Sequence, residues 1–194
     1  MLPIDSNTKQ KAVDILVSAF STVPGALWVV KKDKKLKLRV KALCEYCLET
    51  SLQKDGGFIS SDQKGVALIF DSRKKQKFIS SLLGYIMLGN HCIGWDRAWS
   101  IIVRERTIQQ KRPNTPHLYF WMLAVEDNEN GVETIIELRD FAYELSHKAN
   151  LPICLETTSE RNRVMYQRYG FEVYDTWEVA EQNLKIWFMK REVA

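Results

Sequence analysis

The stretch "LPICLETTSERNRVMYQRYGFEV", from Leu151 to Val173, decides the fold. Its first part, Leu151 to Thr157, is a short apolar segment of the kind that forms a buried strand. The next part, Glu160 to Tyr169, is predicted to be a short helix, which Gly170 stops because glycine readily adopts the left-handed conformation at a helix end. Another strand is expected from Phe171 to Trp177. The order strand, helix, strand indicates a domain in which helices pack against a sheet.

The segments around this stretch extend the same pattern. "HLYFWMLAV", from His117 to Val125, is apolar almost throughout, which is typical of a central strand covered on both faces. A helix is predicted from Val132 to Asn150, and Leu184 to Lys190 should pair antiparallel with Phe171 to Trp177. The residues of the Val132 helix expected to face the core are Ile135, Ile136, Leu138, Phe141, Ala142 and Leu145.

The first half of the chain is predicted to be mainly helical, with one hairpin. A first helix, capped by Asp5 or Ser6, should run to Phe20, where Val23 to Gly25 breaks it. A second helix is expected from Leu36 to Lys54. Phe58 to Ser60 and Val66 to Phe70 predict a β-hairpin. A helical insert, at about residues 76–112, precedes the central strand.

Composition narrows the class of protein. The chain has 194 residues with 45% hydrophobic and 27% charged residues, which suits one globular domain spanning 1–194. No apolar run is long enough to span a membrane. The N-terminus does not have the layout of a signal peptide, so a cytoplasmic protein is expected.

The basic residues and the cysteines indicate neither a nucleic-acid-binding surface nor a metal site. The net charge is +4, and much of the excess lies between Lys31 and Lys35. No aromatic residues interleave with these lysines, so a solvated loop is favoured over a nucleic-acid-binding surface. Cys44 and Cys47 form a lone C-x-x-C within a helical pattern, with no second pair or nearby histidines to complete a zinc site. We expect them to pack in the core, and we expect no metal site.

The segment from Leu151 to Val173 resembles the Gcn5-related N-acetyltransferase (GNAT) family, through "ETTSERN" and "VMYQRYGFEV". The long insert before an H-x-Y-x-x-x-L-x-V strand, here His117 to Val125, is similar to the layout of one GNAT subgroup. The motifs cover roughly the last 80 residues, a substantial share of a domain of this size. The resemblance implies an α+β (α/β) fold, with a mixed, mostly antiparallel central sheet flanked by helices.

The resemblance also implies a cofactor, acetyl-CoA, in an opening between two central strands. The strand end at Leu123, Ala124 and Val125 would offer backbone groups to the pantetheine arm. Asn162 would form a hydrogen bond with the same arm or cap the local turn. Tyr166 would be the general acid that protonates the departing thiolate. The pyrophosphate would lie on a loop and helix start made of Asn130, Gly131, Val132, Glu133, Thr134 and Ile135.

That loop departs from the family pattern, which has a Q-G-R/K-G-I/L-G sequence. Only Gly131 matches, while Glu133 and Ile135 stand where the family has glycines. A carboxylate a few Å from a pyrophosphate costs on the order of 1 kcal/mol even in wet surroundings. The sequence "AVEDNENGVETIIEL", from Ala124 to Leu138, therefore predicts a sound helix start but weakened cofactor binding.

Other candidate residues are less specific. Glu126 and Glu156 follow or end strands and could be the general base. His117 is expected to be a packing or turn residue. Trp95 and Trp99, at helical spacing, are expected to pack in the core, with a hydrophobic substrate pocket as the alternative.

Three functions remain open from the sequence. The first is transfer of an acetyl group from acetyl-CoA to an amine of a small molecule or peptide. The second is a catalytically inactive GNAT-like module that binds a small molecule or a protein partner. The third, a nucleic-acid-binding domain, has only the lysine run in its favour. A homodimer is compatible with each of them.

Overall fold

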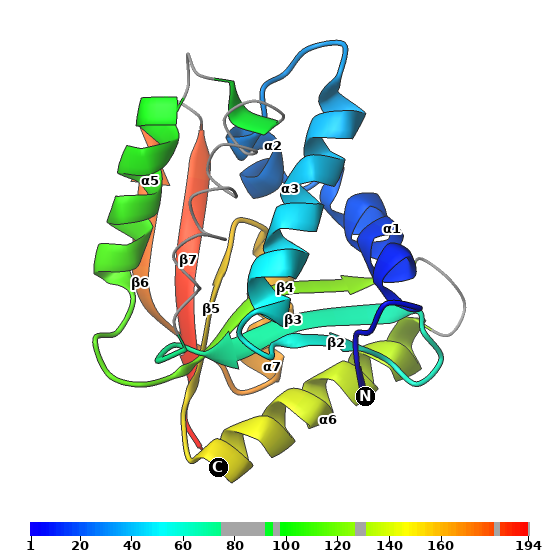
Figure 1. Ribbon diagram of the computed structural model, residues 1–194. Coiled ribbons are helices and arrows are strands. Elements are labelled where there is room, and N and C mark those ends of the chain that lie inside the picture. Colours follow the sequence, from blue (N-terminus) through cyan, green and yellow to red (C-terminus); the bar gives the residue numbers. More distant parts are fainter. Residues whose placement is uncertain (75–91, 95–97, 127–130, 181–182, 194) are drawn as a thin grey trace.

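The computed structural model describes residues 1–74, 92–94, 98–126, 131–180 and 183–193 of the chain (Figure 1). The helices are α1 (Lys9–Phe20), α2 (Pro24–Val29), α3 (Leu36–Leu52), α5 (Ala98–Lys111), α6 (Gly131–Ala149) and α7 (Glu160–Arg168). The strands are β1 (Leu2–Pro3), β2 (Gly57–Ile59), β3 (Gly65–Asp71), β4 (Leu118–Val125), β5 (Ile153–Thr157), β6 (Glu172–Val179) and β7 (Leu184–Arg191).

These strands form one seven-stranded sheet in the order β1-β2-β3-β4-β5-β7-β6. Only β4 and β5 are parallel neighbours, and the other neighbouring strands run antiparallel. The prediction of a mixed, mostly antiparallel sheet flanked by helices is confirmed, as are the β2–β3 hairpin and the β6–β7 pair.

Helices cover both faces of the sheet (Figure 1). α1 and α3 pack against each other and against β3 on one face, and α6 packs against β3 and β4 on the opposite face. α7 contacts β5 and β6. α5 lies beside the other half of the sheet, where Ile108 packs with Ile186 and Phe188 of β7. The sheet therefore lies between two layers of helices, as predicted from a central strand that is apolar on both faces.

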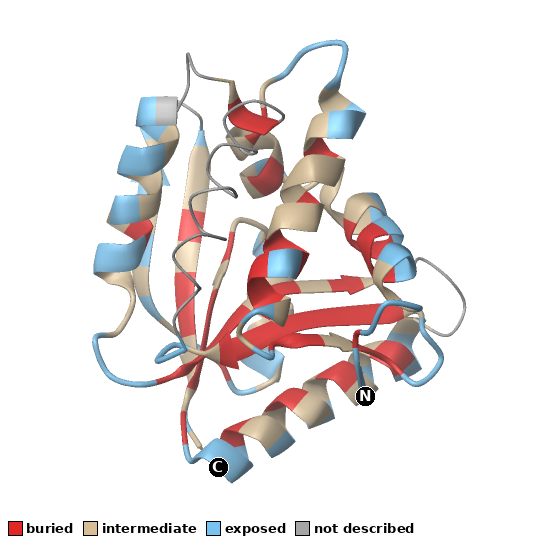
Figure 2. Cartoon of the chain, viewed as in Figure 1, coloured by how far each residue is buried: buried red, intermediate tan, exposed pale blue. Residues whose placement is uncertain are grey.

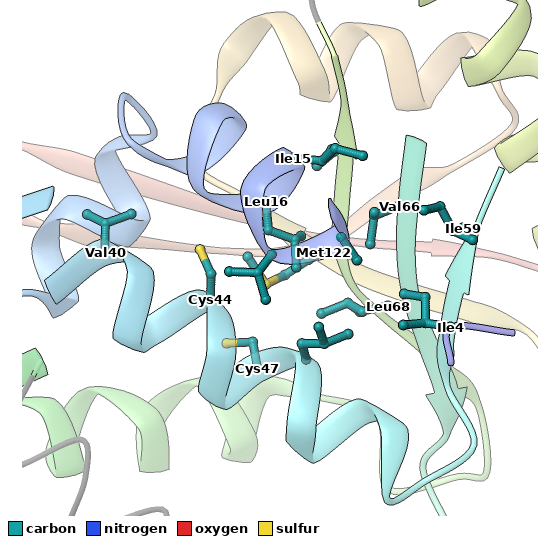
Figure 3. Packing of buried hydrophobic residues seen from close by; sticks show 14 of the residues in the cluster. Ile4, Ile15, Leu16, Val40, Cys44, Cys47, Ile59, Val66, Leu68 and Met122 are labelled. Carbon is teal, nitrogen blue, oxygen red and sulfur yellow. The ribbon is translucent and has the colours of Figure 1, made fainter. Parts of the chain in front are cut away.

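Two apolar clusters lie on the two faces of the sheet, and buried residues follow β3 and β4 along most of their length (Figure 2). One cluster joins α1 and α3 to the sheet and includes Cys44 and Cys47 (Figure 3). Burial raises the pKa of the Cys44 thiol to about 12 and that of Cys47 well above its ordinary value. The two cysteines therefore pack as apolar groups, as the sequence predicted.

The N-terminal elements differ in detail from the prediction. The Asp5 carboxylate accepts hydrogen bonds from the backbone N–H groups of Asn7 and Thr8, so it stabilises a turn and α1 begins only at Lys9. Pro24 does not break the chain but starts α2, because proline at the first helical position lacks only an N–H that would be unpaired anyway. The short strand β1 was not predicted.

Two predictions of burial are wrong. Ile136 of α6 is 40% exposed, because the buried face of this helix is narrower than expected and passes through Thr134, Leu138 and Ala142. Trp99 does not pack in the core, since it is 71% exposed on α5. Its predicted neighbour Trp95 lies outside the described residues, as does most of the predicted insert at 76–112.

The surface features agree with a solvated loop at the lysine run. Lys32, Lys34 and Lys35 are exposed, and Asp33 between them forms an ion pair with Arg39 at 2.6 Å. Within the described ranges, no helix is both long and apolar enough to cross a membrane.

Candidate functional site

The sheet opens between β4 and β5. β4 pairs with β3 along its length but with β5 only at Leu118–Ile153 and Tyr119–Cys154. Beyond those pairs the strands part, and Figure 1 shows β5 and β7 running in a different direction from β3 and β4. From Phe120 to Val125, no other described strand pairs with the second edge of β4. Its backbone N–H and C=O groups are therefore available to a ligand.

A β-bulge interrupts β4 beside this opening. Leu68 faces Met122 and Ile69 faces Phe120, so Trp121 is an extra residue in the ladder. The bulge places Trp121 and Met122 in the same apolar cluster, on the side of α1 and α3. In a regular strand, these two neighbouring side chains would lie on opposite faces of the sheet. Bulges re-aim backbone groups and are common next to active sites.

Helix α7 carries Tyr166 at the other side of the opening. The helix starts at Glu160 because the Ser159 side chain accepts a hydrogen bond from the backbone N–H of Asn162 at 3.3 Å. Tyr166 is half-buried, with its ring 5.6 Å from that of Phe171. Burial raises the pKa of Tyr166 to about 12. Its hydroxyl forms no hydrogen bond to another residue that the structure describes, so a protonated phenol is free for an incoming group.

The groove between α6 and α7 is nearly closed. It holds a cavity of about 20 Å³, room for roughly one water molecule. The Tyr143 hydroxyl donates a hydrogen bond of 2.6 Å to the carbonyl oxygen of Tyr169, and Arg139 lies 5.4 Å from the Tyr169 ring centre. The lining residues are Phe120, Leu123, Ile135, Arg139, Ala142, Tyr143, Met165, Tyr166, Tyr169 and Phe171.

The start of α6 is hydrogen-bonded to the turn between β2 and β3. Thr134 is 2% exposed, and its hydroxyl donates a hydrogen bond of 2.9 Å to Asp62. Val132 is 69% exposed, and Glu133 lies in the first turn of the helix. Asn130, the first residue of the predicted pyrophosphate loop, lies outside the described residues.

Acetyl-CoA, the cofactor that the resemblance implies, fits the site better at the edge of β4 than at the start of α6. The free edge of β4 at Leu123 to Val125, together with the unbonded Tyr166 hydroxyl, suits a thioester and its amide-containing arm. The start of α6 does not suit a pyrophosphate, because Glu133 places a carboxylate where the helix would otherwise attract an anion. Ile135 fills space beside it rather than leaving room for close backbone approach.

A polar network crosses the opening on the opposite face of the sheet. Arg112 donates a hydrogen bond of 2.7 Å to Glu156 of β5, and the Tyr119 hydroxyl of β4 donates one of 2.7 Å to the other Glu156 oxygen. Arg112 also donates to the Tyr119 hydroxyl at 2.6 Å. Since both carboxylate oxygens are engaged, Glu156 is a poor candidate for the general base.

Sequence reasoning named Glu156 but missed Arg112. The two residues are 44 positions apart, and a lone arginine before a proline carries no local signal. His117 is a turn residue as expected, with Nδ1 2.8 Å from the carbonyl oxygen of Thr115. The Glu126 side chain makes no hydrogen bond to any residue in the described part of the chain, so Glu126 stays a candidate base.

Several solved structures share this fold. An acetyltransferase from Corynebacterium glutamicum, described as histone acetyltransferase HPA2 and related acetyltransferase, superposes with a TM-score of 0.70 at 22% identity, over 100% of this chain and 95% of its own. Arylalkylamine N-acetyltransferase 2 from Aedes aegypti gives 0.63 at 15% identity, over 99% and 97%.

The chain has the GNAT fold. The C-terminal condensation domain of Ebony, in complex with beta-alanyl-dopamine, also superposes on the chain, with a TM-score of 0.66 at 13% identity, over 99% of this chain and 97% of its own. No protein-family model and no curated protein sequence matches the chain. At these identities the likeness establishes the GNAT fold, and the activity has to be argued from the site itself.

Proposed function

We propose that the protein is an N-acetyltransferase that moves an acetyl group from acetyl-CoA to an amine of a small molecule or peptide. The observation that carries this proposal is the opening between β4 and β5, with a free strand edge on one side and a protonated, unbonded Tyr166 hydroxyl on the other. The names of the structural relatives, which include arylalkylamine, polyamine and agmatine N-acetyltransferases, support it.

Each part of the site has a separate task in this proposal. Acetyl-CoA, when bound, supplies an acyl group activated as a thioester. The backbone of Leu123, Ala124 and Val125 holds the arm by hydrogen bonds along the strand edge, with Asn162 contributing from α7. The bulge at Trp121 would aim backbone groups at the acyl carbonyl, where an N–H donor would stabilise developing negative charge. Tyr166 holds the proton that a thiolate leaving group requires.

Replacing Tyr166 by phenylalanine tests this assignment. We expect Tyr166→Phe to lower turnover roughly ten- to a thousand-fold, because the proton donor is lost. Calorimetry should show the affinity for acetyl-CoA little changed. Tyr169→Phe is the matched control, since it removes a hydroxyl from the same cavity lining at the end of α7. Equal turnover of the wild type and Tyr166→Phe would remove Tyr166 from the mechanism.

A catalytically inactive binding module is the second candidate, and the closed groove between α6 and α7 favours it. The double substitution Val132→Arg with Glu133→Gln distinguishes the two. Both side chains are exposed, so the fold should tolerate the changes. If the acidic helix start alone weakens the cofactor site, removing one carboxylate should tighten acetyl-CoA binding about fivefold, equivalent to roughly 1 kcal/mol. No binding at millimolar acetyl-CoA in either protein would favour the inactive module.

A further inference from the structure

A second and larger cavity shares no lining residue with the groove between α6 and α7. It measures about 380 Å³, within the size range of small-molecule sites. We call it the Lys54 cavity, lined by Lys54, Phe70, Ser72, Arg73, Gln109, Arg112, Pro113, Asn114, Thr115, Pro116, His117 and Tyr119. These residues come from the segment after α3, from the end of β3 and the residues that follow it, from α5, from the connection between α5 and β4, and from the start of β4.

The lining of the Lys54 cavity is positively charged. It includes three cations and, among the described residues, no aspartate or glutamate. Arg73 and Arg112 are already paired, with Asp71 and Glu156 respectively. Lys54 is half-buried, and its ammonium forms no ion pair with another residue of the described ranges. It lies 4.2 Å from the centre of the Phe70 ring. An unpaired ammonium at the wall of a cavity attracts an anion.

The residues and helix ends around the Lys54 cavity favour a ligand with one negative charge over a ligand with two. α3 ends at Leu52 and α5 ends at Lys111, so both helices present C-termini near the cavity, and these ends repel anions. No helix N-terminus among the described elements lines it. Pro113 and Pro116 have no backbone N–H to donate. A phosphate usually needs such donors, whereas a carboxylate can bind one ammonium or guanidinium group.

The other residues that line the cavity suit a ligand that is mainly apolar and carries a few polar groups. Phe70 and Tyr119 present aromatic rings that contact each other edge to face, with centroids 5.6 Å apart. The two prolines add further apolar surface. Ser72 accepts a hydrogen bond from the His117 backbone N–H at 3.1 Å, which leaves its own hydroxyl proton free to donate.

We propose that the Lys54 cavity binds a small organic monocarboxylate, with its carboxylate on the ammonium of Lys54 and its apolar body against the Phe70 side of the cavity. This proposal is independent of acetyl transfer. Arg112 and Tyr119 line the cavity and also hold Glu156 at the β4–β5 opening, so the two sites share a wall.

Calorimetric titration at low salt, without acetyl-CoA, tests the proposal with a matched set of probes. Benzoate should bind, and benzamide, its neutral isostere, should bind at least tenfold more weakly. If benzamide binds as tightly as benzoate, the charge assignment is wrong. If inorganic phosphate competes with benzoate at equal concentration, the site is a phosphate site and the monocarboxylate proposal fails.

Variants then locate the site. Lys54→Met keeps an unbranched side chain but removes the charge, so benzoate affinity should fall at least tenfold. Lys74→Met is the control, because Lys74 pairs with Asp55 and does not line the cavity, and its affinity should stay within twofold of the wild type. Arg73→Gln, at an exposed side chain, gives a second variant and should weaken benzoate severalfold. Unchanged affinity in Lys54→Met and Arg73→Gln would overturn the proposal.

Discussion

The Tyr166 hydroxyl should make the stability of the folded protein depend on pH in the alkaline range. Burial raises the pKa of Tyr166 to about 12, from about 10 in an unfolded chain. The folded protein therefore holds this proton more tightly than the unfolded chain does. This difference in pKa stabilises the folded protein fully below about pH 10, and the stabilisation is lost as the pH rises from about 10 to about 12. Between those values, the stability of Tyr166→Phe should fall less steeply than that of the wild type.

Urea unfolding at pH 9 and at pH 11 measures this difference. Other tyrosines also ionise in that range, so the comparison between wild type and Tyr166→Phe is the informative quantity. Equal loss of stability in both proteins would show that the Tyr166 phenol ionises as it does in water. The same raised pKa implies that any change in turnover near neutral pH arises from the titration of another group.

The Arg112–Tyr119–Glu156 network allows a prediction about stability. Only 13% of the Glu156 side chain and 19% of the Arg112 side chain are exposed. Glu156→Ala would leave the arginine poorly solvated and without its main partner, so it should destabilise the fold by about 3 kcal/mol. Denaturant unfolding measures this. In a double-mutant cycle with Arg112→Met, the second change should cost far less once the first is made. Simple additivity of the two effects would contradict a coupled pair.

The contact between α6 and the β2–β3 hairpin depends on Gly65. A Cβ atom at this position would lie 2.5 Å from Thr134 Cγ2 and 2.9 Å from Leu138 Cδ1, both on α6. Gly65→Ala should therefore push the helix away and destabilise the fold by roughly 1–3 kcal/mol. Gly131→Ala is the matched control at the start of the same helix, since its Cβ would meet nothing closer than 3.8 Å.

Gly131→Ala should change stability by less than about 0.5 kcal/mol, because the added Cβ meets no close neighbour. It also tests the cofactor site, because a Cβ on an exposed helix start obstructs a ligand that needs close backbone approach. Weaker acetyl-CoA binding with unchanged stability would place the cofactor at this helix start. Unchanged binding would place the cofactor elsewhere.

Local pattern was sufficient to predict α6, α7, β4 and the β6–β7 pair, because each is set by residues close in sequence. Ser159 and Gly170, for example, delimit α7 from either side. The bulge at Trp121 could not be predicted, because it depends on the register between β3 and β4. The Lys54 cavity and the Arg112–Glu156 pair were missed for a similar reason: they join residues that only the fold brings together.

The same limit applies to the closed groove between α6 and α7. The sequence predicted a cofactor site weakened at its loop, through Glu133 and Ile135. The structure adds that Tyr143 of α6 and Tyr169, directly after α7, line this groove, which no motif indicated. Cofactor binding would therefore require these side chains to move as well as the helix start to accept a phosphate.

The sheet is held together across its opening mainly by one apolar cluster. β4 and β5 share only two paired positions, so few backbone hydrogen bonds join the half that contains β3 to the half that contains β7. The cluster under α6, by contrast, contains Ile69 of β3, Leu155 of β5 and Met189 of β7. Leu138 of α6 lies within it and is fully buried. We therefore predict that residues 1–194 unfold as one cooperative unit.

Native-state hydrogen exchange of amides in β3 and β7 tests this prediction with Leu138→Ala. The substitution should cost about 2–5 kcal/mol, because it leaves a cavity in the shared cluster, and it should lower the protection of both strands equally. Ile136→Ala, on the same helix but 40% exposed, should lower protection by less than about 1 kcal/mol. If β7 kept its wild-type protection while β3 lost protection, the two halves of the sheet would be separate folding units. The β4–β5 opening would then be a boundary between them.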